Sequence, residues 1–202
     1  MAVGADRGVK SLIVAADADG YEYAHWEGVK ALRHATDRFR RAHQALSRTK
    51  KGSTGRVRAK ERVARVHKQV ADRRRHIAHQ ASYDLATTVA TLCIEDLGIA
   101  GLMKNHRLAK SLADAAMGEA GRCLSYKCAW YGADLRLADR WLASSKTCSG
   151  CGHKKDHLEL SERTYQCEHC GLDIDRDLNA AVNLARWPAL QAQGEAALVP
   201  AA

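Results

Sequence analysis

Short apolar segments alternate with longer amphipathic segments along the chain. An apolar run at 12–16 and alternating aromatic residues at 21–26 predict two or three strands joined by tight turns. Further strands are predicted at 91–97 and 133–141. Helices are predicted over four segments: 27–46, 56–89, 107–131 and 177–187, the last ending before Pro188. This order of elements, with strands first, then a long helix and then a strand–helix–strand unit, indicates a mixed α/β domain.

Positive charge is concentrated in one part of the chain. The 202 residues carry 32 Lys and Arg against 23 Asp and Glu, a net charge of +9. Segment 30–80 holds 17 basic and three acidic residues, so the remainder is mildly acidic. Such a segment indicates a polyanionic partner, usually nucleic acid, and a solvated helix face is the alternative. The candidate phosphate-binding residues lie on the polar face of the longest predicted helix: Arg58, Arg62, Arg65, Lys68, Arg73, Arg74 and Arg75.

Composition and hydropathy exclude several classes of protein. A content of 46% hydrophobic and 27% charged residues argues against global disorder. Apolar runs are far shorter than the roughly 20 residues of a membrane helix, and the first residues lack the pattern of a secretory signal. These features predict a cytoplasmic globular protein.

Four of the seven cysteines form two CxxC pairs separated by 15 residues: Cys148, Cys151, Cys167 and Cys170. This spacing is typical of a four-cysteine zinc site, and four sulfur ligands make such a zinc structural because they leave no open position. A glycine follows each pair, where a tight turn often needs positive φ. A reducing cytoplasm disfavours disulfides, and the doubling of the pair disfavours a redox motif.

The remaining thiol and imidazole side chains near the module have simpler interpretations. The histidines of the module are alternative ligands, and we expect them at the surface: His153, His157 and His169. The three other cysteines lie in apolar contexts and are predicted to be buried thiols: Cys93, Cys123 and Cys128.

Three acidic residues lie where a predicted strand or turn ends: Asp6, Glu95 and Asp177. A carboxylate beside apolar neighbours needs a cation, a helix cap or a metal. Three acids from separate segments can hold two divalent metals about 4 Å apart, the arrangement used for phosphodiester hydrolysis, and Mg²⁺ suits such oxygen ligands. Helix capping by Asp175 or Asp177, and a surface ion pair for Asp96, are equally compatible alternatives.

Six motifs follow one another along the chain: GADRG, ADRRRHIAHQAS, CIEDLGIAGL, ADRWLASSKTCSGCG, CEHCG and DRDLNAAVNLAR. The chain resembles the C-terminal nuclease half of the transposon-encoded TnpB family, whose members are relatives of the type V CRISPR effectors. The resemblance rests on these motifs and their order and spans residues 3–187. GADRG alone is unspecific, whereas SSKTCSGCG followed by CEHCG and DRDLNAAVN is highly specific. The resemblance implies a RuvC-like domain of ribonuclease H fold, a mixed sheet with flanking helices, interrupted by a zinc ribbon.

The resemblance also implies that the three acids named above are catalytic and hold Mg²⁺ or Mn²⁺. The family's third acid stands two residues before an asparagine, here Asn179, which selects Asp177. Asp173, Asp175 and Asp177 alternate and would share a face in an extended segment, so Asp175 is the second choice.

The implied domain organisation has four parts: a nuclease domain over 1–145 with a basic helical insertion at 27–89, a zinc ribbon over 146–172 that binds target nucleic acid, the last nuclease segment over 173–187 and a disordered tail over 188–202. Two departures from the family stand out. The chain starts five residues before Asp6, so we expect it to lack the family's N-terminal region, which grips guide RNA and reads the short motif flanking the target. A truncated or decayed gene, a misplaced start codon or an excised fragment would each account for this. Arg7 stands where the family usually has an apolar residue.

The sequence therefore predicts a metal-dependent endodeoxyribonuclease associated with a prokaryotic nucleoid, with DNA as a partner and guide RNA as a further candidate. One alternative is a catalytically silent zinc-ribbon remnant or regulator that binds DNA or RNA. A zinc-stabilised interaction module with no nucleic-acid role is the other, and it leaves the basic segment unexplained.

Overall fold

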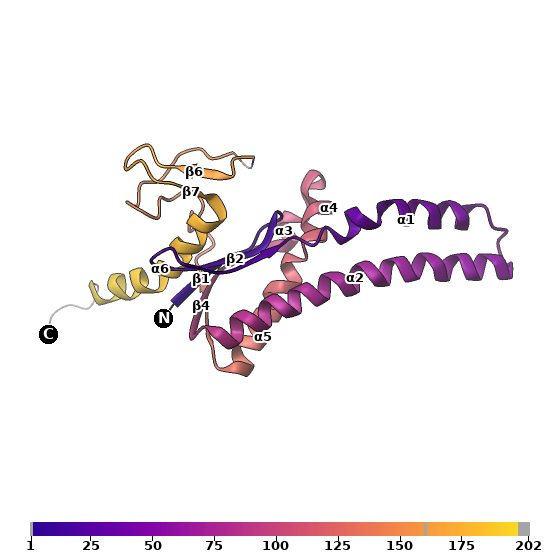
Figure 1. Ribbon diagram of the computed structural model, residues 1–202, viewed down its shortest axis with the longest axis horizontal. Coiled ribbons are helices and arrows are strands. Elements are labelled where there is room, and N and C mark those ends of the chain that lie inside the picture. The colour runs from indigo at the N-terminus through magenta and orange to yellow at the C-terminus, as the bar shows by residue number, and fades with distance from the viewer. Residues whose placement is uncertain (1, 160, 198–202) are drawn as a thin grey trace.

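A five-stranded mixed sheet forms the body of the protein, as the computed structural model shows for residues 2–159 and 161–197 (Figure 1). The strand order is β3-β2-β1-β4-β5. The strands are β1 (Ala2–Asp6), β2 (Ser11–Asp17), β3 (Glu22–Glu27), β4 (Thr91–Glu95) and β5 (Asp134–Ala138). The first three pair antiparallel, whereas β4 runs parallel to β1 and β5 parallel to β4. The predicted mixed α/β fold is confirmed.

Helices cover both faces of this sheet, so alternate residues of the central strands are buried on opposite sides. Leu92 and Ile94 of β4 pack in the main core with helices α2 (Thr54–Thr88) and α5 (Met117–Tyr131). Cys93, between them, packs with Leu184 of helix α6 (Arg176–Ala197) on the other face. Because both faces are covered, every residue of β2 is buried.

Helix α6 lies directly on the central strand at Gly4. A Cβ atom on Gly4 would overlap the backbone of α6 at Ala181 and Ala185 and would stand 2.7 Å from Leu184 Cβ. Only glycine permits this approach, because any side chain would push the helix away from the sheet. The contact places the first turn of α6 beside the end of β1.

Two long helices, α1 (Ala31–Ser47) and α2, extend together away from the sheet (Figure 1). Helix α2 has 35 residues and is therefore about 52 Å long. Its first turn is capped by Ser53 Oγ, which accepts a hydrogen bond from the Arg56 N–H at 3.2 Å. Ala35, Phe39 and Val70 form the apolar seam between the two helices. No described helix is long and apolar enough to cross a membrane.

Three predicted helix boundaries are wrong. The first helix begins at Ala31 instead of residue 27, because Glu22–Glu27 completes β3. The predicted helix 107–131 is divided into α4 (His106–Ala115) and α5, because Ala116 adopts a left-handed conformation with φ 59°. A short helix, α3 (Ile99–Leu102), precedes them and was not predicted.

The third error concerns Pro188, which lies inside α6 and does not end it. A proline removes one backbone hydrogen bond, but the alanine, leucine and glutamine residues that follow favour a helix. The predicted disordered tail over 188–202 is therefore wrong as far as Ala197, and residues 198–202 lie outside the described part of the chain.

The cysteine module forms a separate lobe beside α6 (Figure 1). Strands β6 (Thr164–Gln166) and β7 (Asp173–Asp175) pair antiparallel within it. Tyr165 is fully buried and fills the interior of the module, and its hydroxyl donates to the carbonyl groups of Lys146 and His153 at 3.1 and 3.2 Å.

Candidate functional site

Asp6 and Glu95 end two neighbouring parallel strands. In the register of β1 and β4, Ala5 lies opposite Ile94, so Asp6 and Glu95 lie next to each other at the same edge of the sheet. The carboxyl ends of parallel strands are a frequent position for functional groups. The two acids predicted from separate motifs are therefore neighbours in the fold.

Asp177 lies in the first turn of α6 and is 9% exposed. Burial raises the pKa of Asp6 well above its usual value, and the negative charges of Glu95 and Asp177 raise it further. Arg176 and Arg7 oppose this effect without cancelling it. The structure thus places Glu95 and Asp177 close enough to Asp6 for their negative charges to act on it.

Asp175 has a different task. Its Oδ1 accepts hydrogen bonds from the N–H groups of Asp177 at 2.8 Å and Leu178 at 3.2 Å, which makes it the N-cap of α6. The extended segment ends at Asp175, so the expectation that Asp173, Asp175 and Asp177 share a face is wrong. The capping alternative is confirmed for Asp175.

Asp96, next to Glu95, forms an ion pair at the surface. It accepts a hydrogen bond from Arg140 at 2.6 Å in an exposed ion pair, as the alternative interpretation predicted. Two consecutive acids at the end of β4 therefore have separate roles, one towards the site and one at the surface.

Two residues that were not predicted to belong to the site hold Glu95 in place. Ser144 Oγ donates a hydrogen bond to Glu95 Oε1, and the Arg7 guanidinium donates to the Glu95 carbonyl oxygen. Arg7 is buried against Gly121 of α5, where any side chain would displace the guanidinium. Its Nε has no hydrogen-bond acceptor among the described residues. Burial lowers the pKa of Arg7, and the nearby acids oppose that effect.

The four predicted cysteines converge on one point. Their Sγ atoms all lie within 4.8 Å of one another, and those of Cys148 and Cys170 are 3.6 Å apart. Gly152 and Gly171 have φ of 78° and 75°, as predicted for the turns. Hydrogen bonds from backbone N–H groups, that of Cys170 first, lower the pKa of Cys167 to about 6, whereas burial raises the pKa of Cys148. This geometry suits a tetrahedral metal with four sulfur ligands.

The other predictions about cysteine and histidine are also confirmed. Cys93, Cys123 and Cys128 are buried. The three histidines of the module are exposed, and the rings of His153 and His169 stack with centroids 5.7 Å apart.

Two asparagines of α6 attach the cysteine module to this helix. The fully buried Asn179 accepts from the Ser149 N–H at 2.9 Å and donates to the Thr147 carbonyl at 2.8 Å. Asn183 donates to the carbonyl groups of Ser144 and Thr147 at 2.8 and 2.6 Å. These contacts give both amides of the DRDLNAAVN segment a structural role that the sequence alone did not reveal.

The predicted phosphate-binding residues lie along α2 and differ in availability. Arg58, Arg62, Arg65 and Arg73 are exposed. Lys68 forms an exposed ion pair with Asp72 at 2.6 Å, and Arg75 lies 3.9 Å from the same carboxylate. Arg74 is mostly buried and pairs with Asp114 at 2.8 Å. Arg74 thus serves the fold, whereas its exposed neighbours remain candidates for contact with a polyanion.

Comparison with protein-family models shows which family has this architecture. Residues 1–106, more than half of the chain, match the model described as "Probable transposase", of the OrfB type found in IS605 elements. The chain belongs to the TnpB family. Residues 118–184 match a second model, "Cas12f1-like, TNB domain", which covers the cysteine module and the start of α6. This TnpB relationship agrees with the resemblance carried by the motifs.

Individual relatives support the same assignment. A "Putative RNA-guided DNA endonuclease" of Streptomyces pristinaespiralis is 40% identical over 183 residues, which cover 91% of this chain and 44% of the relative. A protein of the same description in Mycobacterium tuberculosis is 38% identical over 191 residues, 92% of this chain and 41% of the relative. The chain therefore spans less than half the length of these relatives.

A solved structure shares the fold. The chain in a cryo-EM structure of a Cas12f1–sgRNA–target DNA complex superposes with a TM-score of 0.67 at 20% identity, covering 91% of this chain and 49% of that one.

Proposed function

We propose that this chain is the nuclease portion of an RNA-guided DNA endonuclease, with two divalent metals held by Asp6, Glu95 and Asp177. The observation that carries the proposal is the convergence of these carboxylates from β1, β4 and α6, where burial and repulsion raise the pKa of Asp6. Hard oxygen ligands with excess negative charge suit Mg²⁺ or Mn²⁺. The sheet order, with a third acid on the final helix, supports a RuvC-like ribonuclease H fold.

The neighbouring residues prepare the acids for this chemistry. When bound, two metals supply an activated water and stabilise the leaving oxygen of a phosphodiester. Ser144 fixes one oxygen of Glu95, and Arg7 fixes the backbone of the same residue. Asp175 caps the helix that carries Asp177, so this carboxylate has a defined position too. Positions held by such hydrogen bonds reduce the reorganisation that catalysis requires.

The cysteine module is proposed to hold a structural zinc through its four sulfurs. A segment of about 25 residues has too small a hydrophobic core to fold without a bound metal. The module contacts the first turns of α6, which carry Asp177, so it can present a nucleic-acid strand close to the acids. We assign the ribbon to binding target nucleic acid on this ground.

The exposed arginines of α2 are proposed to contact phosphates of DNA or guide RNA. The names of the TnpB relatives support both partners. The matched pair Arg62→Ala and Arg74→Ala tests the assignment, because only Arg62 is exposed. Losing one phosphate contact lowers the slope of log affinity against log salt by about 0.9 for duplex DNA. We expect this change for Arg62→Ala, whereas Arg74→Ala lowers the thermal stability instead.

A cleavage assay with matched acid variants tests the nuclease assignment. The full chain is incubated with single-stranded DNA and Mg²⁺ or Mn²⁺, beside Glu95→Gln and its neighbour Asp96→Asn. We expect Glu95→Gln to abolish cutting and Asp96→Asn to retain it, because Asp96 pairs with Arg140 at the surface. Equal cutting by wild type and Glu95→Gln would refute the assignment. A wild-type chain that retards DNA on a gel without cutting it would favour the binding remnant instead.

A further inference from the structure

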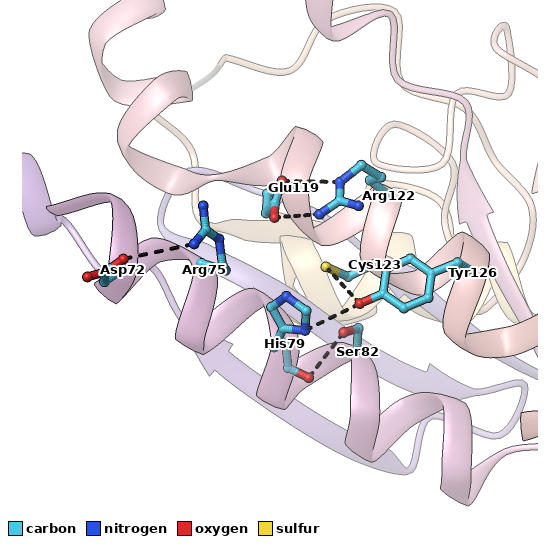
Figure 2. Close-up of polar contacts among 8 residues, drawn as sticks. All are labelled: Asp72, Arg75, His79, Ser82, Glu119, Arg122, Cys123 and Tyr126. Carbon is cyan, nitrogen blue, oxygen red and sulfur yellow. Dashed lines mark hydrogen bonds and ion pairs between the residues drawn. The ribbon is translucent and has the colours of Figure 1, made fainter. Parts of the chain in front are cut away.

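A second cluster of metal-ligating side chains lies between α2 and α5 (Figure 2) and shares no residue with the three acids or with the cysteine module. It consists of His79 on α2 and of Glu119 and Cys123 on α5. The two residues of α5 are four positions apart, so they project from the same face of the helix towards α2. One nitrogen, one oxygen and one sulfur atom of these side chains all lie within 4.8 Å of one another.

The chemical nature of this cluster suits zinc. Zinc binds imidazole nitrogen, carboxylate oxygen and thiolate sulfur at about 2.0–2.3 Å, so the ligand atoms of a tetrahedral site lie roughly 3.5 Å apart. The three ligand atoms, all within 4.8 Å of one another, need to come only slightly closer to reach that spacing. Cys123 is buried, and His79 and Glu119 are half-buried, so the site is partly shielded from water. Three protein ligands leave the fourth position to a water molecule.

Neighbouring residues already hold these side chains in place, as Figure 2 shows. Arg122 donates to both oxygens of Glu119, at 2.7 and 3.3 Å, which favours the charged carboxylate. The Tyr126 hydroxyl lies 3.3 Å from His79 Nδ1 and 3.9 Å from Cys123 Sγ. Partners of this kind orient the ligands in many metal sites.

The backbone and the charges around the cluster are also defined. The carbonyl oxygen of His79 accepts hydrogen bonds from Lys127 of α5 and from Ser82 at 3.1 Å, which fixes this turn of α2 against α5. Arg75, whose side chain pairs with Asp72, is a second cation near Glu119. The two arginines disfavour a cation, whereas the carboxylate and a thiolate together supply two negative charges.

We propose that His79, Glu119 and Cys123 form a second zinc site that clamps α2 to α5. The site lies on the part of α2 that packs against the body, and the rest of α2 extends outwards with α1 (Figure 1). A zinc ion here ties the basic helices to the sheet and so limits the angle at which they leave it. This inference does not depend on the proposed nuclease activity.

Zinc stoichiometry tests the site in the intact chain. The wild type and three variants, Cys123→Ala, Glu119→Gln and Cys128→Ala, are dialysed to equilibrium against micromolar free zinc, and the zinc-to-protein ratio is measured by mass spectrometry. Cys128 is the matched control, because it is a buried thiol on the same helix outside the cluster. We expect Cys123→Ala and Glu119→Gln to bind one zinc fewer than the wild type, and Cys128→Ala to bind the same number. This difference is independent of how the cysteine module is occupied.

Two results would overturn the proposal. One is an unchanged ratio in Glu119→Gln, the variant that leaves the buried core intact. The other is an equal loss of zinc in Cys123→Ala and Cys128→Ala, which would trace the loss to damage of α5. Cobalt substitution provides an independent measurement: the wild type minus Glu119→Gln difference spectrum should contain a thiolate-to-cobalt charge-transfer band, and its absence would also refute the site.

Discussion

The tight contact between α6 and β1 makes Gly4 a sensitive test of how Asp177 is positioned. A Cβ atom introduced by Gly4→Ala would stand 2.7 Å from Leu184 Cβ and closer still to backbone atoms of α6. Carbon atoms pack favourably at about 3.5–4.0 Å. The helix must therefore move away from β1 by roughly 1 Å, because the backbone atoms of a packed helix cannot rotate aside as a side chain can.

The expected cost has two parts. Overpacking of this kind typically costs about 1–3 kcal/mol of the free energy of unfolding. For a chain of this size, about 2 kcal/mol lowers Tm by roughly 4–8 °C. The displaced helix carries Asp177, and a shift of about 1 Å in an active site can lower the rate roughly 100-fold. The proposed cleavage should therefore fall much more than the stability suggests.

Thermal unfolding followed by circular dichroism, and cleavage of single-stranded DNA, measure the two effects. The matched control is Gly55→Ala in the first turn of α2, where a Cβ would meet only Ser53 Oγ at 3.7 Å. This control should be as stable as the wild type or up to about 1 kcal/mol more stable. If Gly4→Ala kept the wild-type Tm and the wild-type rate, the close contact between α6 and β1 would not position Asp177.

Three further perturbations have defined outcomes. Asp6→Asn should stabilise the metal-free protein in urea unfolding, because it removes a charge that desolvation disfavours and that Glu95 and Asp177 repel; a less stable variant would contradict this. Hydrogen bonds from the Leu32 N–H and from Arg74 lower the pKa of Asp114 against the effect of burial. Asp114 therefore stabilises the fold at pH values above its pKa in the unfolded chain, and this stabilisation is lost as the pH falls through its lower pKa in the folded protein. Asp114→Asn should flatten the acid limb of a curve of stability against pH. Chelation of zinc should make the cysteine module, but not the sheet, sensitive to limited proteolysis; equal resistance with and without chelator would argue against a zinc-dependent fold.

Features that depend on a few neighbouring residues could be predicted from the sequence. The paired cysteines with their following glycines define two tight turns whatever surrounds them, and the positive φ of Gly152 and Gly171 agrees. The short apolar run at the start of segment 91–97 placed Glu95 at the charged end of a buried strand, and the structure ends β4 at this residue. Local spacing carries this information, because strand and turn geometry repeats over two to four residues.

Features decided by tertiary packing could not be predicted in the same way. Whether Asp175 or Asp177 faces Asp6 depends on where helix α6 begins. The helix begins at Arg176, and a start one residue earlier or later would turn a different side chain towards Asp6. The break at Ala116 requires a left-handed alanine, which local preference disfavours and which the packing of α4 and α5 must stabilise. Pro188 is the opposite case, a strong local stop signal that the surrounding helix overrides.

Helix α6 links these observations, because its two faces have separate tasks. Ala181 and Ala185 are four residues apart and lie against Gly4, whereas Asn179 and Asn183, also four apart, bind the cysteine module. The Asn183 amide binds the carbonyl of Ser144, whose hydroxyl in turn binds Glu95. One helix thus fixes a carboxylate of its own, through Asp177, and supports a second on β4. A displacement of the cysteine module would therefore be transmitted to Glu95 and Asp177 through hydrogen bonds as well as through the helix. This coupling gives a physical reason for the position of the module shortly before Asp177 in the sequence.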